Sequence, residues 1–422
     1  MRYLSINGKK EKIPSFPHHK DYLYRCRQFF MASGIWSHLS KGRFATIKEL
    51  YYGWKNRTAV PRDLLIDITS NCNLSCKGCW AADYDEGDNI SFDKLDDLMC
   101  QMESLGMMDC IMSGGEPLIR KDDIIKLCEK HRRLTFGIFT NATLIDDELA
   151  AEMKRLGNVN AFVSIEGYRE ENDYRRGDGV YDQIIGAMDC LKRHDIGFAF
   201  SICYHAKNYE IVTSDAYLDF LREKGAWFGW LFNYVPVGSD ADLSLVLNPE
   251  QRVYVQKRIA DYGKRNDFLM IDFWHNGHLV FGCVGAGNGF VHITAKGDVE
   301  PCAFCHYSDA NIYDMTLKDA LKAPFFTAFR KAQPFSKNPL RSCPLIDEPG
   351  QLVDIVNKTG ARSTHFSSPE SPEALKEKTL PGAEAWRPYA EELFEGFPEK
   401  AKKNWPRFLG FLKVKQRLTD GR

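Results

Sequence analysis

Long apolar runs and an excess of charge of one sign are both missing from this chain of 422 residues. No stretch approaches the roughly twenty apolar residues that a membrane-spanning helix needs. Lysine and arginine total 56 against 57 for aspartate and glutamate, so the overall charge predicts no nucleic-acid partner. A signal-peptide pattern is also absent, and we therefore expect the 13 cysteines to be reduced in a cytoplasmic protein rather than paired in disulfides.

Three cysteines, Cys72, Cys76 and Cys79, lie close together on one loop without a fourth ligand nearby. Trp80 follows directly, and the nearest downstream histidine is His131. A structural zinc site normally completes its tetrahedron with a fourth Cys or His at short spacing. An iron-sulfur cube with three thiolates instead leaves one iron with open positions, where a small molecule can bind the metal. We therefore favour a cluster over zinc or three unrelated buried thiols.

The segments around these cysteines indicate two neighbouring strands. The β-branched run 64–69 is typical of a buried parallel strand and ends just before the cysteine loop. A second apolar run, 110–112, precedes Gly114, Gly115 and Glu116. Loops at the carboxyl ends of such strands converge on one face of an α/β barrel. There the glycines let the backbone approach a ligand closely, and the glutamate offers a carboxylate to an ammonium group.

This order of residues resembles the radical S-adenosylmethionine (SAM) superfamily, whose cluster motif is C-x3-C-x2-C followed by an aromatic residue. The resemblance implies that the three cysteines hold a [4Fe-4S] cluster and that the Gly-Gly-Glu segment binds the methionyl amino group of SAM. It also implies that Ser164 and Glu166 contact the SAM ribose, with Glu where Asp is more usual. Arg176 resembles a carboxylate clamp, and Arg175 is the alternative for this role. For each of these residues a solvated surface position remains open.

The first half of the chain alternates strands with helices. The predicted strands are 64–69, 110–112, 136–141, 161–167, 198–203 and 227–232, and examples of the helices are 91–105 and 181–194. The fold class that follows is α/β, a partial (β/α)6 TIM-like barrel. The family resemblance implies in addition a small C-terminal β-hairpin domain for an auxiliary cluster. Right-handed crossovers would place the loops discussed above on one rim.

A second cysteine group comprises Cys283, Cys302, Cys305 and Cys343. With Gly297 between the first two, it resembles the auxiliary-cluster domain called SPASM in its long form and twitch in its short form. The long form carries seven cysteines, so four imply the short form with a second [4Fe-4S] cluster. A four-cysteine zinc site is the alternative. Runs 290–294 and 298–300, on either side of a Gly-containing turn, predict a hairpin here.

Four segments are expected from this organisation. They are a mostly helical extension (1–60), the radical SAM core (61–265), the auxiliary-cluster domain (266–350), and a linker with an amphipathic tail (351–422). The Ser, Pro and Glu content of 363–384 predicts a linker or covering loop. The tail, 405–418, is apolar and basic, so weak contact with a membrane surface is one expectation. Packing on its own core is the favoured alternative.

The activity implied by the resemblance is reductive cleavage of SAM to a 5'-deoxyadenosyl radical, which removes hydrogen from an unidentified peptide, metabolite or lipid precursor. An auxiliary cluster could accept an electron from the product radical or could ligate the substrate. The first role is favoured and implies net oxidation, with flavodoxin or ferredoxin as a suitable reductant. A non-catalytic iron-sulfur electron carrier and a zinc-stabilised binding protein are the alternatives from other classes.

No catalytic residue is assigned from the sequence. Asp272, His275 and His278 are candidate general bases because they precede the second cysteine group, although such residues are more often structural. Aromatic residues near the sixth strand are predicted either to shape a pocket or to fill the barrel core. These are Trp227, Trp230, Phe232 and Tyr234. The remaining cysteines are predicted to be core thiols. These are Cys26, Cys100, Cys110, Cys128, Cys190 and Cys203.

Overall fold

The centre of the fold is a parallel β-sheet. The computed structural model describes residues 3–6, 9–12, 50–82, 87–238, 241–266, 268–277, 282–365, 367–397 and 399–420. Six neighbouring strands run parallel in chain order, as predicted. They are β3 (Asp63–Thr69), β4 (Asp109–Gly114), β5 (Thr135–Thr140), β6 (Val159–Ser164), β7 (Phe198–Tyr204) and β8 (Ala226–Asn233). The α/β fold class with a TIM-like partial barrel is confirmed.

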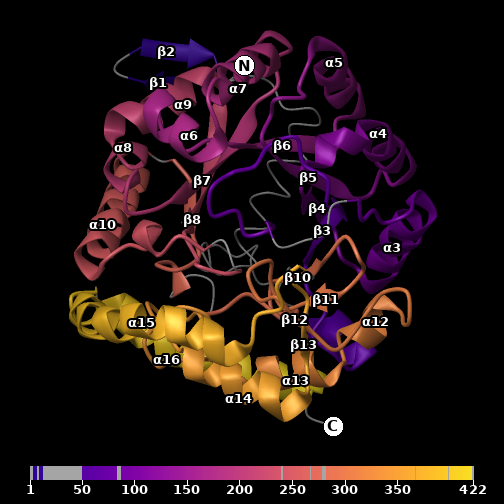
Figure 1. Cartoon of the computed structure of the whole chain (residues 1–422), viewed down its shortest axis with the longest axis vertical. Coiled ribbons are helices and arrows are strands. Elements are labelled where there is room, and N and C mark those ends of the chain that lie inside the picture. Colours follow the sequence, from indigo (N-terminus) through magenta and orange to yellow (C-terminus); the bar gives the residue numbers. More distant parts are fainter. Residues whose placement is uncertain are drawn as a thin grey trace.

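Helices surround these strands (Figure 1). The long ones are α3 (Phe92–Leu105), α4 (Lys121–Lys130), α5 (Asp147–Leu156), α7 (Val180–Arg193), α9 (Asp215–Lys224) and α10 (Pro249–Asn266). Helix α3 shows why they form here: Ser91 caps its first turn by accepting a hydrogen bond from the Lys94 N–H, and Gly106 ends it in the left-handed region. The apolar residues of α3 recur on one face of the helix, and that face is buried.

Two additions widen the sheet beyond the six predicted strands. Strand β9 (Met270–Asp272) pairs with β8 at one edge. At the other edge β10 (Phe290–Ile293) runs parallel to β3 and antiparallel to β11 (Val299–Glu300). The predicted hairpin therefore exists, but it is hydrogen-bonded to the first barrel strand. Gly289, just before the hairpin, is hydrogen-bonded to Arg62 and Asp63 at the start of β3, whereas His306, beyond the hairpin, stacks on Trp80 of the cysteine loop.

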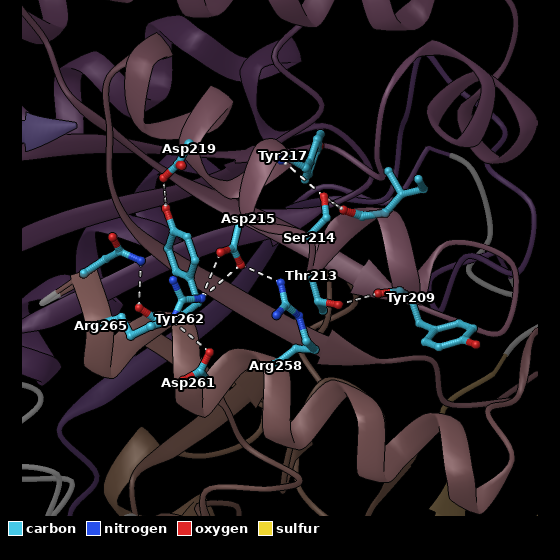
Figure 2. Close-up of polar contacts among 12 residues, drawn as sticks. Tyr209, Thr213, Ser214, Asp215, Tyr217, Asp219, Arg258, Asp261, Tyr262 and Arg265 are labelled. Atoms are coloured by element: carbon cyan, nitrogen blue, oxygen red, sulfur yellow. Dashed lines mark hydrogen bonds and ion pairs between the residues drawn. The ribbon is translucent and has the colours of Figure 1, made fainter. Parts of the chain in front are cut away.

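The outer helices α9 and α10 are tied together by polar side chains (Figure 2). Asp215, the first residue of α9, accepts hydrogen bonds from Arg258 at 2.5 Å and Arg265 at 2.9 Å. The Tyr262 hydroxyl donates to Asp219 at 2.5 Å. Asp215 and Arg265 are partly exposed to solvent, whereas Tyr262 is buried. None of these residues lines the cavity described below, so the network fixes the outer wall.

The C-terminal helices lie along one side of the barrel, between α10 and the short α12 in Figure 1. They are α13 (Pro324–Ala332), α14 (Pro349–Thr359), α15 (Pro372–Glu395) and α16 (Glu399–Asp420). Helix α15 packs against α10 and α14. The guanidinium group of Arg252 lies 4.1 Å from the centroid of the buried Trp386 ring and also pairs with Asp347 at 3.1 Å. These contacts join the last part of the chain to the barrel.

Short elements complete the described chain. They are β1 (Tyr3–Ile6), β2 (Lys9–Lys12), β12 (Tyr307–Ser308), β13 (Arg362–Ser363), α6 (Arg169–Arg176), α8 (Tyr209–Val212), α12 (Leu317–Ala320) and the 3-10 turns η1 (Pro117–Arg120) and η2 (Leu243–Leu245). Strands β1 and β2 form an antiparallel hairpin, so the predicted mostly helical extension does not hold there. Residues 50–56 are helical, and 13–49 lie outside the described residues.

The linker predicted for 363–384 is wrong from Pro372 onward, where α15 begins. Ser371 accepts a hydrogen bond from the Ala374 N–H and the proline occupies the first turn, where its missing N–H costs nothing. The Ser-Pro-Glu composition that favoured a loop is the start signal of this helix. The Glu, Ala, Leu and Lys residues that follow are good helix formers.

The amphipathic tail forms α16 and packs on its own chain. Trp405, Leu412 and Lys415 are buried, and the Trp405 indole N–H donates to the Lys337 carbonyl at 2.7 Å. Contact with a membrane surface through this tail is therefore not supported. None of the described helices is long and apolar enough to cross a membrane.

Candidate functional site

A cavity of about 330 Å³ brings the two cysteine groups together. Six of the seven predicted metal ligands line it, and the seventh, Cys305, is buried beside them. The six are Cys72, Cys76, Cys79, Cys283, Cys302 and Cys343. Every predicted cofactor-binding residue lines the same cavity, namely Gly114, Gly115, Glu116, Ser164, Glu166 and Arg176. Cys72 and Cys343, which are 271 positions apart in the chain, thus line one cavity.

The first cysteine group sits on the loop after β3, with Cys72 exposed and Cys76 and Cys79 half-buried. Burial of its thiol, together with the charges of Glu116 and the other two thiols, raises the pKa of Cys72 to about 11. Burial also raises the pKa of Cys79, with Cys76 adding to the effect. Because these thiolates repel one another, they need a bound cation to stay ionised together. This donor set fits an iron-sulfur cluster with one incompletely ligated iron.

The Gly-Gly-Glu segment is hydrogen-bonded to the cysteine loop itself. The Gly115 N–H donates to the Thr69 carbonyl at 2.9 Å, and the Glu116 N–H donates to the Asn71 carbonyl at 2.8 Å. A Cβ atom on Gly114 would lie 2.1 Å from the Thr69 oxygen, and one on Gly115 would lie 2.0 Å from the Asn71 oxygen. No side chain fits at either position, so glycine is required for these backbones to touch.

Glu116 is buried and surrounded by hydrogen-bond donors. Its Oε1 accepts from the Leu118 N–H at 3.0 Å and the Thr140 hydroxyl at 2.7 Å. Its Oε2 accepts from the Asn141 N–H at 2.8 Å. Burial nevertheless raises the pKa of this carboxyl, because the donors only partly replace water. An arriving ammonium group would stabilise its ionised form.

Thr140 and Asn141 are site residues that sequence reasoning missed as partners of Glu116. The Asn141 side-chain amide also donates to Asn73 at 2.8 Å, so this residue connects the glutamate with the cysteine loop. Both residues end the strand predicted at 136–141, and that position on the rim was the sequence signal that could have identified them.

Glu166 forms ion pairs with both candidate clamp residues. Its Oε1 lies 2.7 Å from Arg175 Nη1 and 2.6 Å from Arg176 Nη2, and its Oε2 accepts from the Cys203 N–H at 3.2 Å. The carboxylate is fully buried in this arrangement. The predicted ribose contact of Glu166 stays a prediction, as does that of Ser164, which ends β6 at the cavity wall.

The second cysteine group comes from three segments: the loop before β10, the turn after β11 and the loop before α14. Burial raises the pKa of Cys283 to about 11 and that of Cys343 to about 12. Burial also raises the pKa of Cys302 and Cys305, and the charges of the other thiols add to it. Cys305 is buried and the other three cysteines are half-buried. Four thiols whose charges act on one another fit a fully ligated [4Fe-4S] cluster, and zinc stays the alternative.

The candidate general bases do not face the cavity. Asp272 and His275 are buried and bonded to each other at 2.6 Å, and Asp272 also accepts from the Tyr204 hydroxyl at 3.0 Å. The two residues between them, Phe273 and Trp274, line the cavity instead. His278 lies outside the described residues. No base is therefore assigned.

Aromatic rings form much of the cavity wall. The ring centroids of Phe139 and Trp230 lie 5.1 Å apart and are stacked, and Phe232 contacts Phe273 and Phe304 at 6.1 and 6.3 Å. Trp230, Phe232 and Tyr234 line the cavity, whereas Trp227 does not. The pocket prediction thus holds for three members of the aromatic set.

The prediction of core thiols is confirmed for Cys110, Cys128 and Cys190 and wrong for Cys100, which is exposed. Cys100 lies on the solvent side of α3, away from the buried stripe of that helix. Cys203 is half-buried and lines the cavity, so it is not a plain core thiol. Cys26 lies outside the described residues.

Comparison with known proteins gives two family matches. The radical SAM superfamily matches residues 66–213, and the iron-sulfur cluster-binding SPASM domain matches residues 283–344. An AdoMet-dependent heme synthase of Methanosarcina barkeri is 25% identical over 290 residues, which cover 62% of this chain and 82% of the relative. A PqqA peptide cyclase of Gluconobacter oxydans is 25% identical over 311 residues, covering 67% and 82%.

The solved structure of Streptococcus suis SuiB bound to S-adenosylmethionine superposes with a TM-score of 0.59 at 18% identity. The match covers 72% of this chain and 76% of SuiB. At this identity the likeness supports the fold.

Proposed function

Because this chain belongs to the radical SAM superfamily and carries a SPASM domain, we propose that its cavity holds SAM at the three-cysteine cluster and an apolar substrate between the two cysteine groups. The observation that carries the proposal is that both groups and the Gly-Gly-Glu segment line one cavity. As a radical SAM enzyme it uses [4Fe-4S] clusters and SAM. When bound and reduced, such a cluster would supply the electron that splits SAM into methionine and a 5'-deoxyadenosyl radical, and that radical would remove a hydrogen atom from the substrate.

We assign the binding of SAM to three parts of the cavity. Gly114 and Gly115 bring the backbone close to the cysteine loop, and Glu116 pairs with the methionyl ammonium group. Arg176 lines the cavity and would pair with the methionyl carboxylate through the guanidinium N–H groups that its ion pair with Glu166 leaves unused. Arg175 keeps Glu166 in place and is the alternative clamp. These residues orient SAM and exclude water from it.

We assign the second [4Fe-4S] cluster to Cys283, Cys302, Cys305 and Cys343. Loss of a hydrogen atom leaves a substrate radical, and a further electron and proton must leave for a closed-shell oxidised product to form. The four-cysteine site lies on the cavity wall, where it would accept that electron. Net oxidation of the substrate follows, and an external flavodoxin or ferredoxin would re-reduce the first cluster. We expect this chemistry to take place in the reducing cytoplasm.

The cavity wall favours an apolar or planar substrate. Phe139, Trp230, Phe232, Phe273 and Phe304 supply ring faces and edges, and no candidate base faces the cavity from β9. The relatives include a heme synthase, whose product is a large planar ring, and a peptide cyclase. We therefore place a flat, largely apolar metabolite ahead of a polar peptide.

The test is anaerobic reconstitution with iron and sulfide, metal analysis, and incubation with dithionite and SAM. We expect both sites to carry iron and sulfide, and 5'-deoxyadenosine to form. Protein that binds zinc at both sites, or that leaves SAM intact while fully loaded with iron and sulfide, would contradict the proposal. The first result favours a binding protein, and the second an electron carrier.

A further inference from the structure

Gly78, between the second and third cysteines of the first group, touches an aromatic ring from the opposite side of the barrel. Its φ is +61°, in the left-handed region. A Cβ atom here would lie 2.7 Å from Tyr234 Oη and 2.8 Å from its Cε2. The ring of Tyr234 thus occupies the space that a side chain at position 78 would need.

Tyr234 is firmly held where it follows β8. Its side chain is 3% exposed, and its backbone N–H donates to the Tyr204 carbonyl at 3.1 Å. Its hydroxyl accepts a hydrogen bond from the Asp242 N–H at 2.9 Å. Asp242 in turn caps η2 by accepting from the Ser244 N–H. The loop after β8 therefore presents this ring in one orientation.

The other side of the same bend is held by α6. The Lys77 N–H donates to the Arg175 carbonyl at 2.9 Å, and the Arg175 side chain is fixed by Glu166 at 2.7 Å. Lys77 and Gly78 are thus supported from two directions, by the end of α6 and by the ring of Tyr234. These two residues separate Cys76 from Cys79, so their backbone path sets how the two thiols lie relative to each other.

We propose that Tyr234 is a positioning residue for the SAM-binding cluster, acting through its ring against Gly78. This inference rests on the proposed function, which places that cluster on Cys72, Cys76 and Cys79. The ring holds the bend at Lys77–Gly78, and the bend would keep the three thiols directed toward one cluster. The hydroxyl keeps the ring in place and contributes less than the ring does.

The first test compares Tyr234→Ala with Tyr234→Phe in anaerobically reconstituted full-length protein. We expect the alanine variant to form 5'-deoxyadenosine about 10- to 100-fold more slowly, as when reacting groups move by about 1 Å. Its reduced SAM-cluster EPR signal should be altered and should respond weakly to added SAM. Phenylalanine keeps the ring and should restore both the spectrum and a rate within about fivefold of wild type, since one neutral hydrogen bond contributes modestly.

The second test uses shape complementarity between the two positions. Gly78→Ala should by itself slow SAM cleavage, because the new methyl collides with Tyr234 and the residue has positive φ. In the double variant Gly78→Ala/Tyr234→Ala the collision is gone. Its rate of SAM cleavage relative to wild type should therefore exceed the product of the relative rates of the two single variants. Phe232→Ala, in β8 two residues before Tyr234 and also at the cavity, is the matched control and should combine with Gly78→Ala multiplicatively.

A wild-type EPR signal and SAM response in Tyr234→Ala would overturn the inference, and so would independent effects of positions 78 and 234. The auxiliary cluster provides an internal control, because its iron should remain in every variant. If wild-type protein itself carries a three-cysteine cluster but does not cleave SAM, the proposed function fails, and the EPR comparison still tests the role of Tyr234 in shaping that cluster.

Discussion

The two cysteine groups differ in how the chain brings their thiols together. Cys72, Cys76 and Cys79 lie on one loop, and the backbone around them is supported by the Gly-Gly-Glu segment and by α6. The second group draws its four thiols from three segments, of which one precedes and one follows a hairpin bonded to β3. The first site therefore depends on local loop geometry, and the second on the correct assembly of the C-terminal half.

In the proposed function, this difference corresponds to a division of chemical roles. A group of three thiolates leaves one iron open to a ligand, while four thiolates close the second cluster. The open site also has an exposed cysteine, Cys72, whereas none of the four auxiliary cysteines is exposed. Reactivity toward SAM and electron acceptance are thus expected to be separable by mutation.

Replacing a cysteine of the first group should have the largest effect. Cys76→Ala should abolish formation of 5'-deoxyadenosine, because the two remaining thiolates would not hold a cluster in the position that SAM binding requires. Half of the bound iron should be lost while the auxiliary cluster stays. Iron analysis measures the loss of the cluster, and chromatography measures 5'-deoxyadenosine. Cys100→Ala, at an exposed thiol outside the cavity, is the control, and a Cys76 variant that still cleaves SAM would break the comparison.

Replacing a cysteine of the second group should give the opposite pattern. Cys343→Ala should lose or alter the auxiliary cluster and block oxidation of substrate, yet keep the reductive cleavage of SAM without substrate. EPR of the reduced protein and the rate of 5'-deoxyadenosine formation separate the two effects. Equal loss of SAM cleavage in this variant and in Cys76→Ala would show that the sites are not independent.

Removing the charge of Glu116 should weaken SAM binding. Glu116→Gln keeps the size of the side chain but loses an ionic hydrogen bond, which corresponds to roughly a 10- to 100-fold higher Kd. Burial raises the pKa of this carboxyl, so its neutral form persists to higher pH than in water. The methionyl ammonium requires the ionised form, so wild-type affinity should fall as the pH falls through that raised pKa.

The glutamine variant cannot ionise and should lack this pH dependence. Equilibrium binding of SAM to reconstituted protein across the acidic range provides the check. Equal affinities, or parallel pH profiles, would show that Glu116 does not pair with the ammonium group.

The smallest effect is expected on the outer wall, far from both cysteine groups. Asp215→Asn weakens the contacts of α9 with Arg258 and Arg265, which are partly exposed to solvent. We expect the free energy of unfolding to fall by only about 0.5–1 kcal/mol. Iron content and SAM cleavage should stay unchanged. A change in either would mean that the outer wall is coupled to the clusters.

The sequence alone determined the elements whose evidence is local. The spacing of Cys72, Cys76 and Cys79, the six strands and the hairpin around Gly297 are all read from residues near one another in the chain. Such patterns are reliable because hydrophobic periodicity and ligand spacing act over a few residues. The same locality explains the error at Pro372, where a proline-rich composition matches both a loop and the start of a helix.

Only the tertiary structure decided which side chains meet. It turned Asp272 and His275 away from the cavity while Phe273 and Trp274 line it, and it paired the hairpin with β3. It also set Tyr234 against Gly78, a contact between residues more than 150 positions apart. Contacts of this kind depend on how strands and helices pack, because nothing in the residues beside either position specifies its distant neighbour.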